Sequence, residues 1–312
     1  MSSGAKIQVY CAPEVTTGVL PTTGWKKVRR IKDGLTENVT SSKSESVLDS
    51  RFRQGSTADE SEITGALEVE LSINTFDDFF SAVAMNDWVE DPLDDKKSTL
   101  HFGGDTTKTF TFVKVYSDTN QIHVYRGIRI GGLKLNLGVR SKIKATFDLL
   151  GTDFEVVTVN PVSNAADADD NTLLSALNVI EMTVNGQNTV GTACVQSVEL
   201  TVTNNLSRYD CLGNAKISAQ GYNEKMIDIL LNAQFMFSSQ SATYIPYVKS
   251  KVTMPLKFGI KDKDNNMYEF DFTKLEVKNA PNPDGGGEDD IFLDVEFEQI
   301  KESPVITRTL AA

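Results

Sequence analysis

The chain has 312 residues, enough for about two domains of ordinary size, and its Gly, Thr, Ser and Val content favours a mainly β fold. A formal net charge of −12 argues against a protein that holds nucleic acid tightly, because Lys and Arg must neutralise the phosphates. We expect no membrane segment, since no apolar run approaches the roughly 18 residues that a spanning helix needs, and no secretion signal at the N-terminus. The three cysteines and two histidines lack metal-site spacing, so we expect no metal and no cofactor.

The first part of the chain is polar and thinly patterned. Residues 1–24 carry Pro and Gly and predict an N-terminal arm that orders only against a neighbour. The following segment, GWKKVRRIKDGL, is basic but has no interleaved stacking aromatics, so it is more typical of a solvated face or a subunit contact than of a DNA site. Residues 40–62 are too polar for a core and predict a protruding hairpin or a functional loop.

The stretch from Ile63 to Trp88 predicts a strand followed by a helix. Apolar and polar residues alternate from Ile63 to Ile73, which is the period of a strand with one buried face. From Asn74 the spacing becomes helical, with Asn74 or Thr75 as the expected cap and Asp77 and Asp78 at the positive end of the helix dipole. The residues expected to bury this helix are Phe76, Phe79, Phe80 and Val83.

Three further strands are expected in the first half, separated by turn signals. They lie at 109–116, 121–130 and 133–150, with turns at Ser117–Asn120 and at Gly131–Gly132, and Gly151 closes the unit. In the last strand Ile143, Ala145 and Phe147 share one face. The polar stretch 159–178 is then expected to be a linker with a helical turn.

The second half is expected to repeat the first. A second helix is predicted after Asn223, with the apolar stripe Met226, Ile227, Leu230 and Leu231. Aligning Phe76 with Tyr222 also aligns Phe112 with Phe258 and the turn at Asp118 with Asp264. A final strand, 291–298, matches the strand at 143–149. We therefore predict a duplicated chain with an arm (1–24), a first domain (25–158), a linker (159–178) and a second domain (179–312).

No arrangement of residues predicts catalysis. A nucleophile with its base, paired carboxylates in an apolar pocket and phosphate-binding glycines are not found at the required spacings, so we expect no catalytic residue and no enzyme. A structural assembly protein and a surface-displayed binding module, such as an adhesin or carbohydrate-binding protein made of β-sandwiches, stay open. The second would usually expose aromatics near a groove, whereas the aromatics here fall mostly on buried phases.

Several segments together resemble the major tail tube proteins of long-tailed bacteriophages. They are GWKKVRRIKDGLT, the loop through RFRQG, ITGALEVELSINTFDDFFSAVAMNDW, YRGIRIGGLKLNL and KIKATFDLLG. The resemblance implies two tandem tail-tube domains, each a small β-barrel or sandwich with one flanking α-helix. It also implies homotrimeric rings with pseudo-sixfold symmetry, or homohexamers as the alternative, stacked into a conduit for DNA ejection.

The same resemblance implies partners and a location. The partners would be a tape measure protein, tail terminator and tip proteins, and DNA that passes without tight binding. The protein would assemble in the host cytoplasm and reside in the tail of the virion.

The resemblance directs attention to two sets of exposed residues. An acidic lumen would repel DNA and let it slide, and the polar phases of the strands give Glu68, Glu70, Asp294, Glu296 and Glu298 as candidates. Lys142 and Lys144 occupy the equivalent face, which leaves open a mixed lumen, a different lining strand or an ordinary solvated face. The arm and the loop at 40–62 are expected to reach the neighbouring ring, with Arg51, Phe52, Arg53 and Gln54 at the contact.

Overall fold

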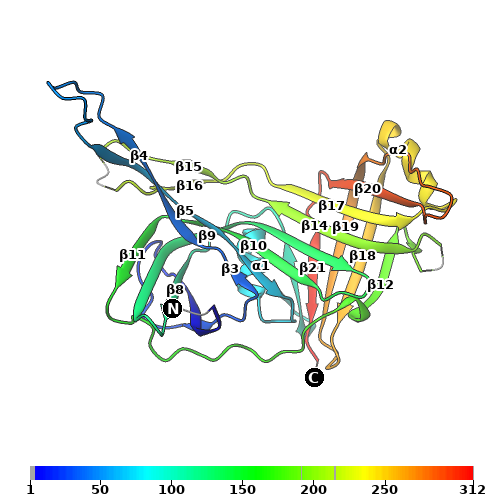
Figure 1. Ribbon diagram of the computed structural model, residues 1–312. Helices are drawn as coiled ribbons and strands as arrows, with labels where there is room; N and C mark the ends of the chain where they lie inside the picture. Colours follow the sequence, from blue (N-terminus) through cyan, green and yellow to red (C-terminus); the bar gives the residue numbers. More distant parts are fainter. Residues whose placement is uncertain (1–3, 191, 214–215, 312) are drawn as a thin grey trace.

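The computed structural model describes residues 4–190, 192–213 and 216–311. Within these ranges the protein is mainly β, as its composition predicts, with two short α-helices, α1 (Asp77–Ala84) and α2 (Tyr244–Ser250). Short 3-10 turns lie at η1 (Gly4–Lys6), η2 (Ala176–Asn178) and η3 (Ser241–Thr243). The first half of the chain lies on the left of Figure 1 and most of the second half on the right, with a long hairpin projecting at the upper left. None of the described helices is long and apolar enough to cross a membrane.

One antiparallel sheet runs through both halves. The two halves meet where β9 pairs with β14, and Leu135 lies opposite Leu200 in this junction. Starting from the projecting hairpin, the hydrogen-bonded order is β4 (Thr36–Lys43), β5 (Ser56–Glu70), β10 (Lys144–Gly151), β9 (Gln121–Gly138), β14 (Val195–Thr203), β17 (Asp228–Met236), β20 (Phe292–Gln299), β19 (Met267–Asn279), β18 (Thr253–Lys261) and β12 (Val179–Val184).

The remaining strands pair at the margins of this order. They are β1 (Ile7–Pro13), β2 (Lys26–Lys27), β3 (Lys32–Asp33), β6 (Val89–Asp91), β7 (Asp94–His101), β8 (Phe110–Tyr116), β11 (Asp153–Val157), β13 (Gln187–Asn188), β21 (Val305–Thr309) and the separate hairpin of β15 (Ser207–Tyr209) and β16 (Gly221–Asn223). β1 pairs with β8 of the same chain along its whole length. The expectation that residues 1–24 order only against a neighbour is therefore wrong for β1.

The order of pairing in the first half recurs in the second. β8, β9, β10 and β5 are successive neighbours, and so are β18, β19, β20 and β17. β11 follows β10 and returns to pair with the first part of β9, just as β21 follows β20 and returns to the first part of β19. In each half a helix precedes the hairpin, α1 before β8–β9 and α2 before β18–β19.

The hydrophobic core is continuous across the two halves. The Phe147 ring on β10 contacts Phe79 and Phe80 of α1 at centroid distances of 5.3 and 5.9 Å. Phe80 in turn lies 5.7 Å from the ring of Tyr268 on β19. Because α1 packs against rings from both halves, neither half buries its own apolar surface alone.

A buried polar contact accompanies this packing. The Tyr268 hydroxyl donates to the Asp77 carboxylate and accepts a hydrogen bond from the Asn74 N–H at 2.8 Å. Arg308 of β21 forms an ion pair with Asp77. Burial and the neighbouring carboxylate raise the pKa of Tyr268 well above its ordinary value, so the hydroxyl keeps its proton.

Replacing Tyr268 with phenylalanine is expected to lower the free energy of unfolding by about 1–3 kcal/mol, because Asp77 and the Asn74 N–H lose a buried partner. Urea unfolding curves measure the change. Tyr247→Phe is the matched control, since that hydroxyl has no hydrogen bond among the described residues. An equal effect of the two substitutions would contradict the stabilising role of the Tyr268 contact.

Two local predictions in the first half are wrong. The residue at the N-cap of α1 is Phe76, and no side chain caps the helix, because Asn74 adopts a positive φ of 68° and Thr75 bonds the Ser72 hydroxyl instead. Gly131 and Gly132 form no turn, because β9 continues through both. A Cβ on Gly132 would lie 3.0 Å from the Val202 carbonyl oxygen, so glycine there permits the close approach of β14.

The predicted second helix is also wrong. Met226 is exposed, Ile227 and Leu230 are partly buried, and the segment from Asp228 onwards is β17, in which Ile229, Leu231 and Ala233 are buried at a period of two. The run Ile229–Leu231 fits both helical and strand spacing. The segment becomes a strand because it pairs with β14 on one side and with β20 on the other. The helix of the second half, α2, begins later, at Tyr244.

The expected linker, 159–178, runs as an extended segment that is bonded to the first half. The Leu174 N–H donates to the Leu71 carbonyl at 2.9 Å, and the Leu174 carbonyl accepts from the Ile143 N–H at 3.0 Å. Leu174 is fully buried. This connection is thus fixed on the sheet between β5 and β10 and ends in η2.

Candidate functional site

The polar face of the central sheet brings together the acidic residues that the sequence analysis singled out. Along each strand one set of side chains enters the core and the alternate set faces outward. One row of outward residues runs directly across the sheet, strand by strand, through Glu70, Lys144, Asn136, Glu199, Asn232 and Glu296. A neighbouring row runs through Glu68, Thr146, Lys134, Thr201, Leu230 and Glu298. The candidates from the two halves therefore lie on one continuous face.

The charges on this face are mixed in the first half and more acidic in the second. Glu68 and Glu70 form ion pairs with Lys144 and Lys142 at 3.0 and 2.6 Å. In the second half Glu296 has a looser contact with Lys278, at 3.4 Å. These pairs are half-exposed, so each contributes little stability but reduces the local charge.

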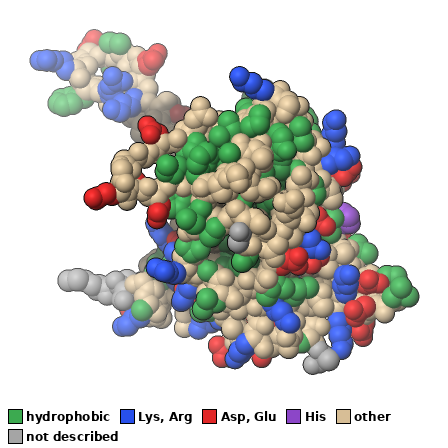
Figure 2. Space-filling view, turned by 90° about the vertical axis from the view of Figure 1, so that its right-hand side faces the viewer, with side chains coloured by type: hydrophobic (Ala, Val, Ile, Leu, Met, Phe, Trp, Pro, Cys, Tyr) green, Lys and Arg blue, Asp and Glu red, His purple; other side chains and the backbone are tan. Residues whose placement is uncertain are grey.

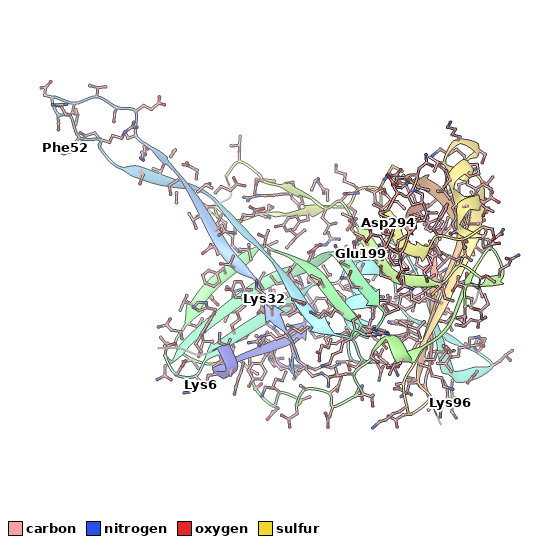
Figure 3. The ribbon with its side chains drawn as sticks, turned by 45° about the vertical axis from the view of Figure 1, so that its right-hand side comes forward. Lys6, Lys32, Phe52, Lys96, Glu199 and Asp294 are labelled. Carbon is pink, nitrogen blue, oxygen red and sulfur yellow. The ribbon has the colours of Figure 1, made fainter. Side chains whose placement is uncertain are left out.

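Two acidic residues of β20 keep their charge uncompensated. Among the described residues Asp294 and Glu298 have no ion pair, and Asp294 accepts a hydrogen bond from the neutral amide of Gln234 at 3.0 Å. Glu199 and Asp294 line the same shallow hollow of the face, and Figure 3 shows both near the upper right, away from Lys96. The carboxylates of β20 that lack an ion pair therefore lie on the polar face of the second half.

Sequence reasoning did not select Lys134 and Glu199, which are charged residues of this face, whereas Asp148 falls on the polar phase that the strand pattern predicts. Lys134 and Glu199 form an ion pair at 3.0 Å across the β9–β14 junction. Burial raises the pKa of the Asp148 carboxyl above its ordinary value. The alternation of Val198, Leu200 and Val202 could have pointed to Glu199, whereas its position beside Lys134 depends on the long-range pairing.

The basic segment after Trp25 is largely bound to its own chain. Trp25 is buried in a small apolar cluster, the Arg29 guanidinium donates to the Ser72 hydroxyl at 2.8 Å, and Arg30 donates to the Ile7 carbonyl at 2.9 Å. Lys32 is exposed on β3, opposite Glu68, and Figure 3 labels it at the base of the projecting hairpin. Most of the basic segment therefore stabilises the fold of its own chain, whereas the exposed Lys32 side chain is available to a partner.

The projecting hairpin consists of β4, β5 and the tip between them, residues 44–55. Figure 3 places Phe52 at its far end, and the Phe52 side chain is 85% exposed. Arg51, Arg53 and Gln54 are exposed beside it. Among the described residues the hydrogen bonds of the tip are local, such as the one from the Phe52 N–H to the Ser50 hydroxyl at 3.1 Å. The rest of the described chain does not bury Phe52.

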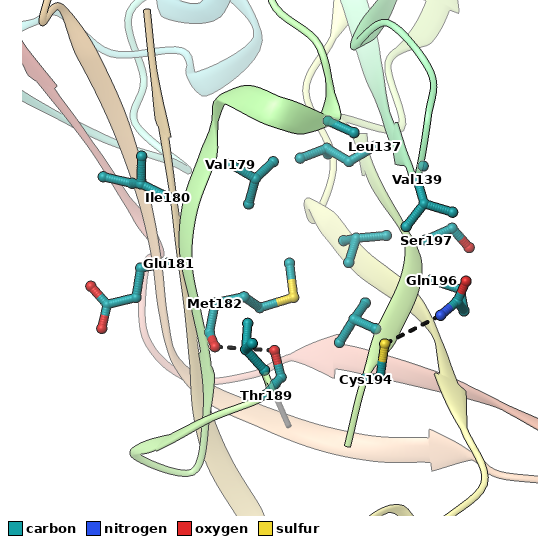
Figure 4. Close-up of a pocket in the computed structure, with 15 residues that line it drawn as sticks. Leu137, Val139, Val179, Ile180, Glu181, Met182, Thr189, Cys194, Gln196 and Ser197 are labelled. Atoms are coloured by element: carbon teal, nitrogen blue, oxygen red, sulfur yellow. Dashed lines mark hydrogen bonds between the residues drawn. The ribbon is translucent and has the colours of Figure 1, made fainter. Parts of the chain in front are cut away.

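An apolar cavity of about 250 Å³ lies between β12 and the ends of β9 and β14. Met182 points into it and Glu181 points away (Figure 4). Its polar contacts are internal, for example Thr189 Oγ1 donating to the Met182 carbonyl at 3.2 Å. No aromatic ring is among the described residues that line it, so it lacks the stacking platform that a carbohydrate site would use.

Comparison with family models shows which family the chain belongs to. Residues 4–298 match the model of the phage tail tube protein family. The chain belongs to this family. A search of curated proteins gave no significant match.

Membership in this family agrees with the absence of a catalytic arrangement on the polar sheet face and on the projecting hairpin of the described chain. Tail tube proteins are structural, non-enzymatic components of the phage tail, and they polymerise into the tube of the virion. The polar sheet face and the projecting hairpin of this tail tube protein are therefore the features to relate to polymerisation and to the contents of the tube.

Proposed function

We propose that three copies of this chain close into a ring with pseudo-sixfold symmetry, and that the rings stack into a tube through which DNA leaves the capsid. The repeated order of β8–β9–β10–β5 and β18–β19–β20–β17 supports a duplicated chain with domains at 25–158 and 179–312, joined by residues 159–178 and preceded by the segment 1–24. Three duplicated chains present six similar units. A homohexamer is the alternative, and it would present twelve.

The polar face of the sheet is the proposed wall of the lumen. The observation that carries this proposal is the uninterrupted row of outward side chains from Glu70 to Glu296, which crosses from one half to the other. A wall with excess carboxylates repels phosphates, so DNA passes without binding tightly. In the first half lysines such as Lys142 and Lys144 offset the carboxylates, so the excess of negative charge on the proposed wall comes from the second half.

The projecting hairpin is the proposed contact between rings. Arg51, Phe52, Arg53 and Gln54 lie at a tip that extends beyond the rest of the fold, and an exposed aromatic side chain at such a position is suited to burial by a partner. Assembly takes place in the host cytoplasm on a tape measure protein, and tail terminator and tip proteins occupy the two ends of the tube.

Negative-stain microscopy of concentrated purified protein tests the assembly directly. Rings or tubes are expected, and class averages of end-on views distinguish three chains from six by the number of similar units around the ring, which is six for three chains and twelve for six. A protein that stays dispersed and monomeric at every concentration would contradict the proposal.

Reversing charge on the proposed wall is expected to make assembled tubes retain DNA. The double variant Glu199→Lys with Glu298→Lys changes the charge of the polar face by +4 per chain. Salt should release the retained DNA, because protein binding to phosphates releases counterions and weakens as the salt concentration rises. Cosedimentation of open-ended tubes with linear DNA at several salt concentrations measures this. Asp94→Lys with Asp95→Lys, at the exposed start of β7, is the matched control. Equal retention by both variants would mean that the polar face is not the wall.

A further inference from the structure

In the first half, Leu174 of the connecting segment fills a site at the end of a strand pair. The site lies one residue beyond the last paired residues of β5 and β10, Glu70 and Lys144. There the Leu71 N–H donates to the Ile143 carbonyl at 2.9 Å, and the Leu174 backbone bridges the two remaining groups, the Leu71 carbonyl and the Ile143 N–H. All three apolar side chains are fully buried. The chain's own connection thus closes this end of the sheet.

The second half has the same site without an occupant from the described chain. The last paired residues of β17 and β20 are Met236 and Phe292, and one residue beyond them the Phe237 N–H donates to the Ile291 carbonyl at 2.9 Å. Among the described residues neither the Phe237 carbonyl nor the Ile291 N–H has a backbone hydrogen-bond partner. The two side chains are 42% and 40% exposed, whereas their counterparts in the first half are buried. We call this position the Phe237–Ile291 site.

Hydrophobic side chains gather at the end of the molecule where this site lies. Figure 2 faces that end and shows them over much of its upper part. Exposed apolar surface next to unbonded backbone groups is suited to burial by another chain.

We propose that the Phe237–Ile291 site receives the hairpin tip of a second copy, with Phe52 in the place that Leu174 has in the first half. The Phe52 N–H donates to the Phe237 carbonyl, the Phe52 carbonyl accepts from the Ile291 N–H, and the ring covers both apolar side chains. The local hydrogen bond of the Phe52 N–H with the exposed Ser50 hydroxyl is exchanged on docking. The inference rests on the proposed stacking of rings and adds the surface that receives the hairpin.

The hairpin and the site lie at opposite ends of the sheet. The antiparallel pairings β5–β10, β10–β9, β9–β14 and β14–β17 are even in number, so β5 and β17 run in the same direction. The tip precedes the start of β5, whereas the site follows the end of β17. In Figure 1 the hairpin projects at the upper left and β17 ends on the right. A copy displaced along the strands therefore brings its tip towards the site of its neighbour.

The charges beside the tip and the site are complementary. Arg51 and Arg53 flank Phe52, whereas Asp289 and Asp290 directly precede the apolar residue of the site on β20's side. Within the described chain none of these four charged residues forms an ion pair. The two acidic residues of the tip come earlier in the sequence than its arginines. Opposite charges at the two ends of one molecule favour head-to-tail association over contact between like ends.

The first half supplies the expected register. Beside the site that Leu174 fills, Ser175 forms an isolated antiparallel bridge with Lys142. A tip seated in the same way places Arg53 at the position of Ser175 and Asp290 at the position of Lys142. Arg53 of one copy is therefore expected opposite Asp290 of the other.

Disulfide trapping tests this register. In a background of Cys194→Ser and Cys211→Ser, where Cys11 stays buried, the variant Arg53→Cys with Asp290→Cys is oxidised after assembly and run on non-reducing gels. Because the links run from ring to ring, the expected result is a ladder of covalent oligomers that extends beyond the number of chains in one ring. The control, Arg53→Cys with Asp228→Cys, has its second cysteine at the opposite end of β17 and is expected to give no ladder.

Microscopy of the same samples separates the outcomes. Tubes without covalent oligomers would overturn the Phe237–Ile291 site as the receiving surface and leave the proposed function intact. Covalent oligomers formed instead by Ala5→Cys with Asp290→Cys would place the N-terminal segment of another copy at the site and would also overturn the inference. Parent protein that forms neither rings nor tubes would overturn both proposals.

A charge swap gives a second readout that needs no oxidation. Arg53→Asp is expected to leave rings that do not stack, because two carboxylates then face each other. Adding Asp290→Arg is expected to restore tubes of parental length, since the charges are again opposite. Failure of the second substitution to restore tubes would contradict the pairing of Arg53 with Asp290.

Discussion

Replacing Phe79 with alanine is expected to lower the free energy of unfolding by about 3–5 kcal/mol. The Phe79 ring is 6% exposed and contacts Phe110 and Phe147 edge-on, each at 5.3 Å. Removing it leaves a cavity that is bordered by α1, β8 and β10. These elements are fixed by the sheet, so they cannot close the space by moving together.

Chemical denaturation of the unassembled protein measures this loss. Phe52→Ala is the matched control, because the same ring is removed from a site that is 85% exposed, and the expected change is within about 0.5 kcal/mol. A Phe79→Ala variant as stable as the parent would mean that α1 is not packed as the ring contacts indicate.

Shortening the projecting hairpin is expected to abolish tubes without unfolding the protein. Replacing residues 45–54 with an Asn-Gly turn keeps β4 and β5 paired, because Ser44 and Gly55 already approach through a backbone hydrogen bond of 2.9 Å. The tip's contacts are local, so the unfolding free energy should stay close to that of the parent. Negative-stain images should show soluble protomers or single rings.

A variant in which residues 45–54 are replaced by Gly and Ser, at unchanged length, separates the effect of hairpin length from that of the side chains. If side chains such as Phe52 make the contact, this variant fails to stack as the shortened one does. If it stacks normally, the length of the hairpin matters and its side chains do not. Tubes formed by the shortened variant would contradict the assignment of this segment to ring stacking.

Sequence patterning predicted the elements whose periodicity is unambiguous. β5 alternates strictly from Ile63, and α1 follows where Phe76, Phe79 and Phe80 change to helical spacing. β17 was missed because Ile229, Leu230 and Leu231 fit both periods, and only the neighbouring strands select one. Tertiary pairing, which a local pattern does not contain, overrode the local preference.

The candidate wall could be predicted only in part. The polar phases of single strands identified Glu68 and Glu296 as outward residues, but their presence on a common face depends on the β9–β14 pairing. That pairing also brings in Lys134 and Glu199. Gly131 and Gly132 predict a turn by residue type, whereas in the structure Gly132 provides room for β14 from the other half.

The projecting hairpin occurs once per chain, although most of its surroundings occur twice. Its counterpart in the second half, β15–β16, lies against its base, where Arg208 forms an ion pair with Glu60 at 2.6 Å and the Ser61 N–H donates to the Ile217 carbonyl at 2.8 Å. A ring of three chains would therefore carry three long hairpins between six similar units. Successive rings could then dock in only three equivalent rotations, whereas a ring of six identical units would allow six. The difference between the two hairpins of each chain would therefore restrict the helical twist of the tube.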